Sequence, residues 1–176
     1  MQLYEAVRAE EALHQGDVFK GVFFPVLNAE YSALLVSAEC DIVNDKVDFY
    51  ILAAVTPLHA VLESINPKDY RDLLAKKANK INNDIFSIVK QKQERWHWLG
   101  SLPEHVGDFV VDFQCLLCLN PDSELGLSGK RVCRITTPYL QSITHFLASY
   151  ISRVALPIEN SDKDKIAKDA FNVITS

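Results

Sequence analysis

Short apolar runs separated by polar turns dominate the first part of the sequence, a pattern that is typical of β-strands. The runs at residues 33–36 (ALLV) and 50–55 (YILAAV) are continuous in apolar residues, as in buried strands. Turn-forming residues at 28–30 and 44–46 separate the runs. The whole pattern predicts six strands, over residues 17–25, 32–37, 47–55, 95–99, 108–119 and 131–136.

Elsewhere the apolar residues recur with helical spacing. A short amphipathic helix over residues 3–14 would end before Gly16. Asn66 followed by Pro67 is a typical helix start, and the polar residues 82–84 leave open whether one kinked helix or two follow it. A further helix is predicted to begin at Thr137-Pro138, and a final short helix is predicted over residues 161–174.

Because strands resume at residue 94, the helical segment 57–93 is predicted to be an insertion in a barrel and not a second domain. We therefore expect an α+β protein with a single domain over residues 1–176. Its partly closed β-barrel would be followed by a packed C-terminal helix. The barrel strands would lie within 17–56 and 94–136, and the C-terminal helices within 138–174.

Charge is distributed unevenly along the 176 residues. The net charge of −5 argues against a general nucleic-acid coat protein, which needs clustered Lys and Arg. The segment from Lys68 to Arg95 nevertheless carries a net +4, which leaves −9 for the remainder. Its lysines, among them Lys76, Lys77 and Lys80, are either the solvated face of an amphipathic helix or a contact for RNA or an acidic protein.

Four cysteines are compatible with a reducing compartment. No apolar run approaches the roughly 20 residues that span a bilayer, and the N-terminus lacks a secretory pattern, so we expect a cytoplasmic protein with no membrane partner. Cys115 and Cys118 have C-x-x-C spacing, but they lie in a predicted strand, where side chains three apart point to opposite faces. They are therefore expected to be buried core residues, and no metal or cofactor is predicted.

The polar residues 37–41 (SAECD) end a core strand and are the first candidate site. Cys40 could act as a nucleophile only if a basic group stabilised its thiolate, and Glu39 and Asp41 beside it oppose this. The alternative is that Cys40 packs inward while Asp41 pairs with an arginine or caps a turn. The basic groups that could support Cys40 are His97, His145, Arg134 and Arg153.

Asp112 lies inside an apolar strand, where an unpaired carboxylate is costly to bury. Arg134 and Arg153 are its expected partners. The pair is either purely structural or part of a functional pocket that also contains Asp41. Two carboxylates without a metal-binding spacing do not predict a cation site.

Several of these segments resemble the PemK/MazF toxin family: Gly16-Asp17-Val18, then Pro25, then residues 33–37 ending in Ser37, then residues 51–56 ending in Thr56. The resemblance implies an SH3-like barrel and the activity of a metal-independent endoribonuclease toxin. It implies a catalytic role for Thr56. Where the family carries a phosphate-binding arginine, this chain has residues 28–32 (NAEYS), so Arg134 is the substitute candidate.

A second resemblance covers S-x-x-C-D at residues 37–41, V-D-F at 111–113 and P-Y-L at 138–140, and is to bacterial proteins of conflict and defence systems. The leading hypothesis is thus a non-enzymatic interaction or sensor component that binds a protein encoded nearby or a small ligand. The alternatives are the endoribonuclease, which uses Thr56 and Arg134, and a cysteine-dependent hydrolase. A homodimer is left open. The predicted binding residues are Ser37, Cys40, Asp41, Asp112, Arg134 and Arg153.

Overall fold

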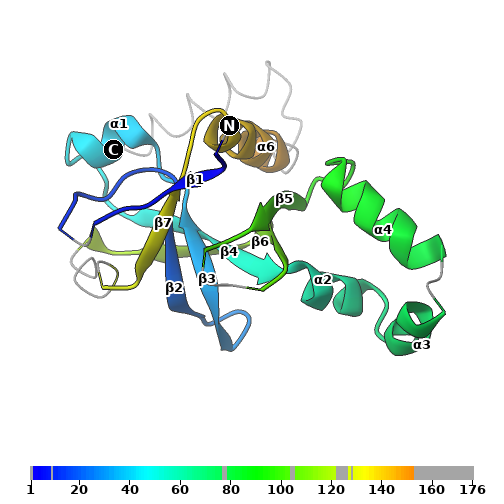
Figure 1. Ribbon diagram of the computed structural model, residues 1–176. Coiled ribbons are helices and arrows are strands. Elements are labelled where there is room, and N and C mark those ends of the chain that lie inside the picture. The colour runs from blue at the N-terminus through cyan, green and yellow to red at the C-terminus, as the bar shows by residue number, and fades with distance from the viewer. Residues whose placement is uncertain are drawn as a thin grey trace, which may run out of the picture.

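The computed structural model describes residues 2–8, 10–76, 79–103, 106–121, 127 and 129–152. Its strands form one antiparallel sheet in the order β1-β7-β2-β3-β4-β6-β5, and the sheet curls into a half-barrel (Figure 1). The strands are β1 (Tyr4–Glu5), β2 (Asp17–Phe24), β3 (Ala29–Leu35), β4 (Tyr50–Pro57), β5 (Trp96–Ser101), β6 (Asp108–Leu119) and β7 (Arg131–Ile135). The described helices are α1 (Glu39–Val43), α2 (Leu58–Ile65), α3 (Tyr70–Ala75), α4 (Asn79–Val89) and α6 (Tyr139–Ser152).

The central strands are buried on both faces, as their continuous apolar runs predict. In β3, Leu34 packs into the core cluster on one face of the sheet, and Leu35 packs into the cluster on the other. Both side chains are fully buried. All six predicted strands are confirmed within a few residues, and the mixed helix-and-sheet class with them. The finer SH3-like assignment and the single domain stay predictions.

Strand β2 does not follow a simple alternation, because its register with β3 shifts between Phe19 and Val22. Gly21, within the shift, has a φ of +62°, which glycine adopts without strain. Phe19 and Val22 therefore share one core cluster, while Phe23 is half exposed. A bulge of this kind changes the alternation, so that residues 19 and 22, three positions apart, both face the same core.

Helix α6 covers one face of the sheet, with Ile143 fully buried in that core. The close approach of its first turn to β2 depends on Gly16, whose φ is +93°. A Cβ at this position would lie 3.0 Å from the Leu140 side chain and 3.1 Å from the Ile135 carbonyl oxygen. The predicted helix after Pro138 is confirmed; the predicted helix at 161–174 lies outside the described residues.

The helical insertion projects from the sheet as an arm of three helices, α2, α3 and α4 (Figure 1). The predicted start at Asn66 is wrong, because α2 ends there and Asn66 is its C-cap. The Asn66 side-chain amide donates to the Leu62 carbonyl and to the Asp84 carboxylate, which ties α2 to α4. Val61, Leu62 and Ile88 pack the arm against the sheet.

The segment before β2 is not the predicted helix over residues 3–14. Tyr4 and Glu5 instead pair with β7 as an edge strand, which makes the sheet seven-stranded. The guanidinium of Arg131 donates to the backbone carbonyls of Arg8, Glu11 and Ala12, and so holds these residues in a non-helical path beside β7. This is the physical reason that helical spacing fails here.

None of the described helices combines the length and the apolar character that crossing a membrane would require.

Truncation of Ile88 tests the attachment of the arm. Ile88→Ala is expected to lower the free energy of unfolding by about 2–5 kcal/mol, because the side chain is fully buried between α4 and the sheet. The matched control is Leu74→Ala, since Leu74 on α3 is 46% exposed, and a change within about 0.5 kcal/mol is expected there. Urea unfolding measures both; equal losses would contradict the packing described.

Candidate functional site

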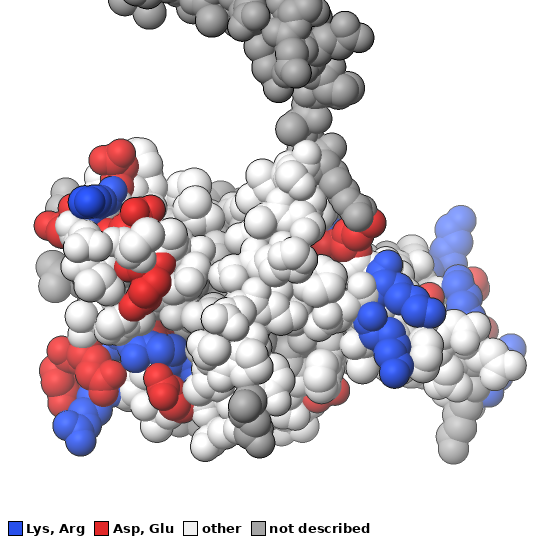
Figure 2. Space-filling model, turned by 90° about the horizontal axis from the view of Figure 1, so that it is seen from above, with Lys and Arg blue, Asp and Glu red and all other residues white. Residues whose placement is uncertain are grey.

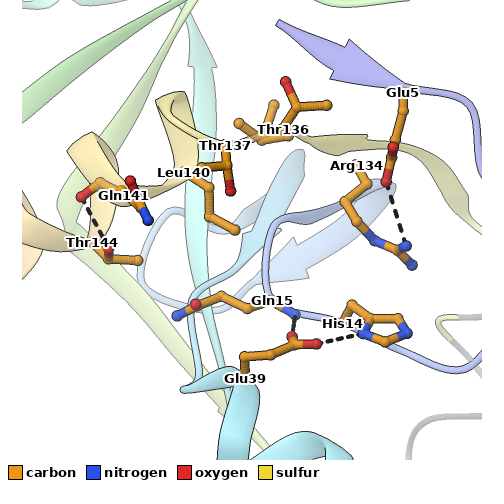
Figure 3. Close-up of a pocket in the computed structure, with 11 residues that line it drawn as sticks. Glu5, His14, Gln15, Glu39, Arg134, Thr136, Thr137, Leu140, Gln141 and Thr144 are labelled. Carbon is orange, nitrogen blue, oxygen red and sulfur yellow. Dashed lines mark hydrogen bonds and ion pairs between the residues drawn. The ribbon is translucent and has the colours of Figure 1, made fainter.

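A polar cavity of about 520 Å³ opens where the N-terminal segment, β7, α1 and the first turns of α6 meet. Figure 3 shows Arg134 and Glu5 on one side of it and His14, Gln15 and Glu39 on the opposite side. The α6 residues close a third side. The cavity is lined by Glu5, His14, Gln15, Glu39, Arg134, Ile135, Thr136, Thr137, Leu140, Gln141 and Thr144.

The wall of the cavity rests on a buried cluster of charges around Asp17, which is 0% exposed. Asp17 Oδ1 accepts from Arg134 Nε at 2.7 Å, and Asp17 Oδ2 accepts from Arg131 Nη1 at 2.9 Å. The backbone N–H of His14 also donates to Oδ2. One carboxylate thus joins β2, β7 and the segment before β2.

Each nitrogen of the Arg134 guanidinium either lies near a carboxylate or is buried. Its Nη1 lies 3.6 Å from Glu5 Oε1 and 3.8 Å from Glu11 Oε2. Its Nη2 is buried and has no hydrogen-bond partner in the described part of the chain. Burial lowers the pKa of Arg134, but the hydrogen bond and charge of Asp17 outweigh this and raise it above its usual value. The group is therefore a permanent, internally paired cation.

His14 and Glu39 form the second polar pair of the cavity. His14 Nδ1 and Glu39 Oε1 are 2.6 Å apart, and the backbone N–H of Gln15 donates to Glu39 Oε2 at 2.7 Å. Burial raises the pKa of Glu39, but these hydrogen bonds and the charges of His14 and Arg134 lower it below its usual value. Glu39 is thus an ionised carboxylate, which can only accept, so Nδ1 of His14 carries the hydrogen of this bond.

Carboxylates outnumber cationic groups around the cavity. Glu5 and Glu39 reach its surface with about half of each side chain exposed, whereas only 16% of the Arg134 side chain is exposed. Arg134 is moreover paired with Asp17, so the two half-exposed carboxylates, Glu5 and Glu39, face one largely covered cation. A site of this kind favours a cationic group or a hydrogen-bond donor over a phosphate.

The structure separates the predicted binding residues. Ser37 and Asp41 line a second cavity of about 320 Å³, beside Cys118. Ser37 Oγ accepts from the Ile51 backbone N–H. Cys40 is exposed on α1, so the prediction that it packs inward is wrong; its Sγ lies 3.5 Å from Asp41 Oδ1.

Asp112 is buried, but its predicted pairing with Arg134 is wrong. Its two oxygens accept from Arg95 Nε at 2.9 Å and from Arg95 Nη2 at 2.7 Å, in a bidentate pair between the residue before β5 and β6. Arg134 pairs with Asp17 instead, and Arg153 lies outside the described residues.

Thr56 and Arg134 do not share a site. Thr56 pairs with Val110 near the end of β4, and β3 and β2 separate β4 from β7 in the sheet. Arg134 lies opposite Asp17 at the start of β2. The prediction that Thr56 and Arg134 act together is therefore wrong, because the sheet order separates the two side chains.

The remaining cysteines offer no reactive pair. Burial raises the pKa of Cys133 to about 12, with the charge of Asp17 adding to the effect. Burial and the Asp112 charge also raise the pKa of Cys115. Cys115 is buried as expected, but Cys118 is exposed, because the two side chains point to opposite faces of β6. No group of three or more metal-ligating side chains is found among the described residues.

Sequence reasoning missed His14, Asp17 and Glu39 as a group. Asp17 carried a usable signal, since it is a carboxylate at the start of an otherwise apolar strand, as Asp112 is within another. Glu39 was visible only as a neighbour of Cys40. His14 carried none, because it lay in a segment predicted to be helical.

Basic residues gather on the helical arm, at the right of the view in Figure 2, whereas acidic and basic residues are mixed at the opposite end. Lys76 and Lys80 are exposed there, and Lys77 lies outside the described residues. The Nζ atoms of Lys90 and Lys92 lie 5.5 and 5.4 Å from the centre of the Phe86 ring.

Comparison with known proteins adds little to this geometry. No family model matches the sequence, and the curated proteins give no match either. Among solved structures, one similar chain is an endoribonuclease in complex with its cognate antitoxin from a mycobacterial species. That match has 14% identity and a TM-score of 0.42, and covers 85% of this chain and 99% of the other. Function is therefore argued from the cavity itself.

Neutralising Asp17 tests the buried charge cluster. Asp17→Asn is expected to lower the free energy of unfolding by about 3–5 kcal/mol, because it leaves Arg131 and Arg134 without their shared anion. The control is Asp48→Asn, an exposed carboxylate, for which a change within about 0.5 kcal/mol is expected. Urea unfolding measures both, and a loss below 1 kcal/mol in Asp17→Asn would contradict the cluster.

Replacing His14 tests the second pair through the titration of Glu39. The folded pKa of Glu39 is depressed, so its contribution to stability is complete above the usual value of 4.5 and is lost as the pH falls through the folded pKa. His14→Ala is expected to move the NMR titration midpoint of Glu39 upward. His59→Ala, at an exposed histidine on α2, is the control and should leave that midpoint in place. An unchanged midpoint in His14→Ala would contradict the pairing of His14 with Glu39.

Proposed function

We propose that this protein is a non-enzymatic binding module of a bacterial defence or toxin–antitoxin-type system, and that the polar cavity receives a cationic side chain of a protein partner. The observation that carries the proposal is the excess of carboxylates at the cavity surface. Glu5 and Glu39 are half exposed there, while the cation beside them, Arg134, is already paired.

The lining supports a guanidinium or ammonium group in particular. Glu39 stays ionised, and its Oε1 and Oε2 each accept one hydrogen bond, which leaves lone pairs on both oxygens for another donor. Thr136, Thr137 and Gln141 add neutral acceptor groups around it. A planar guanidinium with several donors matches such a set better than a point charge does.

A partner side chain held in this way would contribute mainly to specificity and to the rate of association. The cavity is open to solvent, and interactions between half-exposed charges are screened by salt. Hydrophobic contacts outside the cavity would then supply the remaining affinity. The module is expected to be tolerated when expressed alone and to co-purify with a protein encoded beside it.

A titration with a minimal cationic probe tests the proposal directly. N-acetyl-arginine amide is expected to shift the NMR signals of the Gln15 and Gln141 side-chain amides in a saturable way, with an affinity that falls as salt is added. Its uncharged isostere, N-acetyl-citrulline amide, should bind several-fold more weakly. Glu39→Gln should remove the preference between the two probes, and Glu63→Gln on α2 should not.

Two outcomes would overturn the proposal. One is the absence of any saturable shift with the arginine probe. The other is equal binding of the arginine and citrulline probes to the unaltered protein, since the site would then not discriminate between a charged and an uncharged ligand.

The endoribonuclease is the second candidate, and the His14–Glu39 pair favours it. With Nδ1 protonated and held by Glu39, the free Nε2 of His14 could accept the proton of an RNA 2′-hydroxyl as that oxygen attacks the adjacent phosphorus. The 5′-oxygen that leaves would need a proton from a second group. Arg134 could contact the phosphate only if Glu5 and Glu11 were displaced from it.

Expression of the chain alone separates the two candidates. The binding module predicts normal growth and unchanged RNA 5′ ends. Growth arrest with new RNA ends, abolished by His14→Ala and retained in Thr56→Ala, would establish the nuclease instead.

A further inference from the structure

A third cavity, of about 290 Å³, lies between β5, the end of α4 and α6, and differs in character from the polar one. Its walls are largely apolar and include Leu3, Val89, Leu99 and Ile143, and none of its lining residues is charged. It lies on a different side of α6, since Leu140 and Thr144 face the polar cavity while Ser142 and Ile143 face this one.

Three polar side chains converge on its wall around His97, which is only 4% exposed. His97 Nδ1 lies 3.0 Å from the Trp98 carbonyl oxygen. A carbonyl oxygen can only accept, so Nδ1 carries the hydrogen and Nε2 of the neutral ring has one lone pair. The ring is held in place by edge-on packing against Phe146, with centroids 5.2 Å apart.

Two donors compete for that single lone pair. Gln91 Nε2 lies 3.0 Å from His97 Nε2, and Ser142 Oγ lies 3.1 Å from the same atom. The Gln91 amide carries two hydrogens and the Ser142 hydroxyl carries one, and one lone pair makes one good hydrogen bond, so at least one amide hydrogen of Gln91 is left that His97 does not take. Both donors line the cavity, so the spare hydrogen is available to an acceptor placed inside it.

We propose that this cavity binds a small uncharged molecule with an apolar body and one hydroxyl or carbonyl oxygen, and that this oxygen takes the donor left over at His97. The apolar walls receive the body of the ligand, and the absence of charge in the lining disfavours ions. The site is independent of the polar cavity and of its proposed partner.

The protonation state of His97 supports the hydrogen-bond pattern. Burial lowers the pKa of His97, against a smaller opposing effect of the hydrogen bond to the Trp98 carbonyl. The ring is therefore neutral at neutral pH, and its Nε2 is an acceptor, as the competition between Gln91 and Ser142 requires.

The location suggests what binding would do. Val89 and Gln91 belong to the end of the helical arm, whereas Leu99 and Ile143 belong to the body of the protein. A ligand between them contacts both parts, so the bound form would hold the arm more firmly against the sheet.

Two probes that share a body and differ in one oxygen test the proposal. Benzyl alcohol and toluene are titrated into the full-length protein, and the NMR signals of the Gln91 side-chain amide and the Trp98 indole N–H report occupancy. Both signals are expected to shift saturably, and benzyl alcohol is expected to bind at least about fivefold more tightly than toluene, the effect of one net hydrogen bond.

Removal of one donor supplies the decisive variant. In Gln91→Leu, the single hydroxyl hydrogen of Ser142 satisfies His97 Nε2 and no donor is left over, so the ratio of the two affinities, followed at the Trp98 indole N–H, is expected to fall towards one. Ser149→Ala, further along α6 and outside the cavity lining, should leave the ratio unchanged. Urea unfolding of both variants confirms that they are folded.

The proposal is overturned by any of three results: no saturable shift with either probe, equal affinity of both probes for the unaltered protein, or an oxygen preference that survives in Gln91→Leu.

Discussion

The carboxylate of Asp17 is the interaction on which the rest of the structure depends. It is fully buried and pairs with Arg131 and Arg134, at the point where β2 meets β7. Charges taken out of water are costly unless each is paired with good geometry, and here both arginines donate to the one carboxylate at 2.7 and 2.9 Å. That arrangement sets the register at the junction and the position of Arg134 in the polar cavity.

The same cluster explains why the N-terminal segment is extended. Arg131 donates to three backbone carbonyls of that segment as well as to Asp17. Since these contacts hold the segment beside β7, they also bring His14 within 2.6 Å of Glu39. The polar cavity is therefore a consequence of how the buried arginines use their donors.

Helix α6 divides the molecule into two chemical environments. On one side lies the acidic, solvent-open cavity with Glu5 and Glu39; on the other lies the uncharged cavity with His97. The end of the helical arm contributes Val89 and Gln91 to the uncharged cavity and nothing to the acidic one.

The sequence by itself determined the six longer strands, the helix after Pro138 and the class of fold. These features depend on local alternation, turn residues and apolar runs, which neighbouring residues encode. Only the tertiary structure decided which charges meet. Asp17 and Arg134 are 117 positions apart, and their contact exists because β7 adds beside β2 rather than beside β6. For Asp112, the sequence predicted that a buried carboxylate needs a cationic partner. The strand order decided that this partner is Arg95. Strand order is a global property, and local pattern does not encode it.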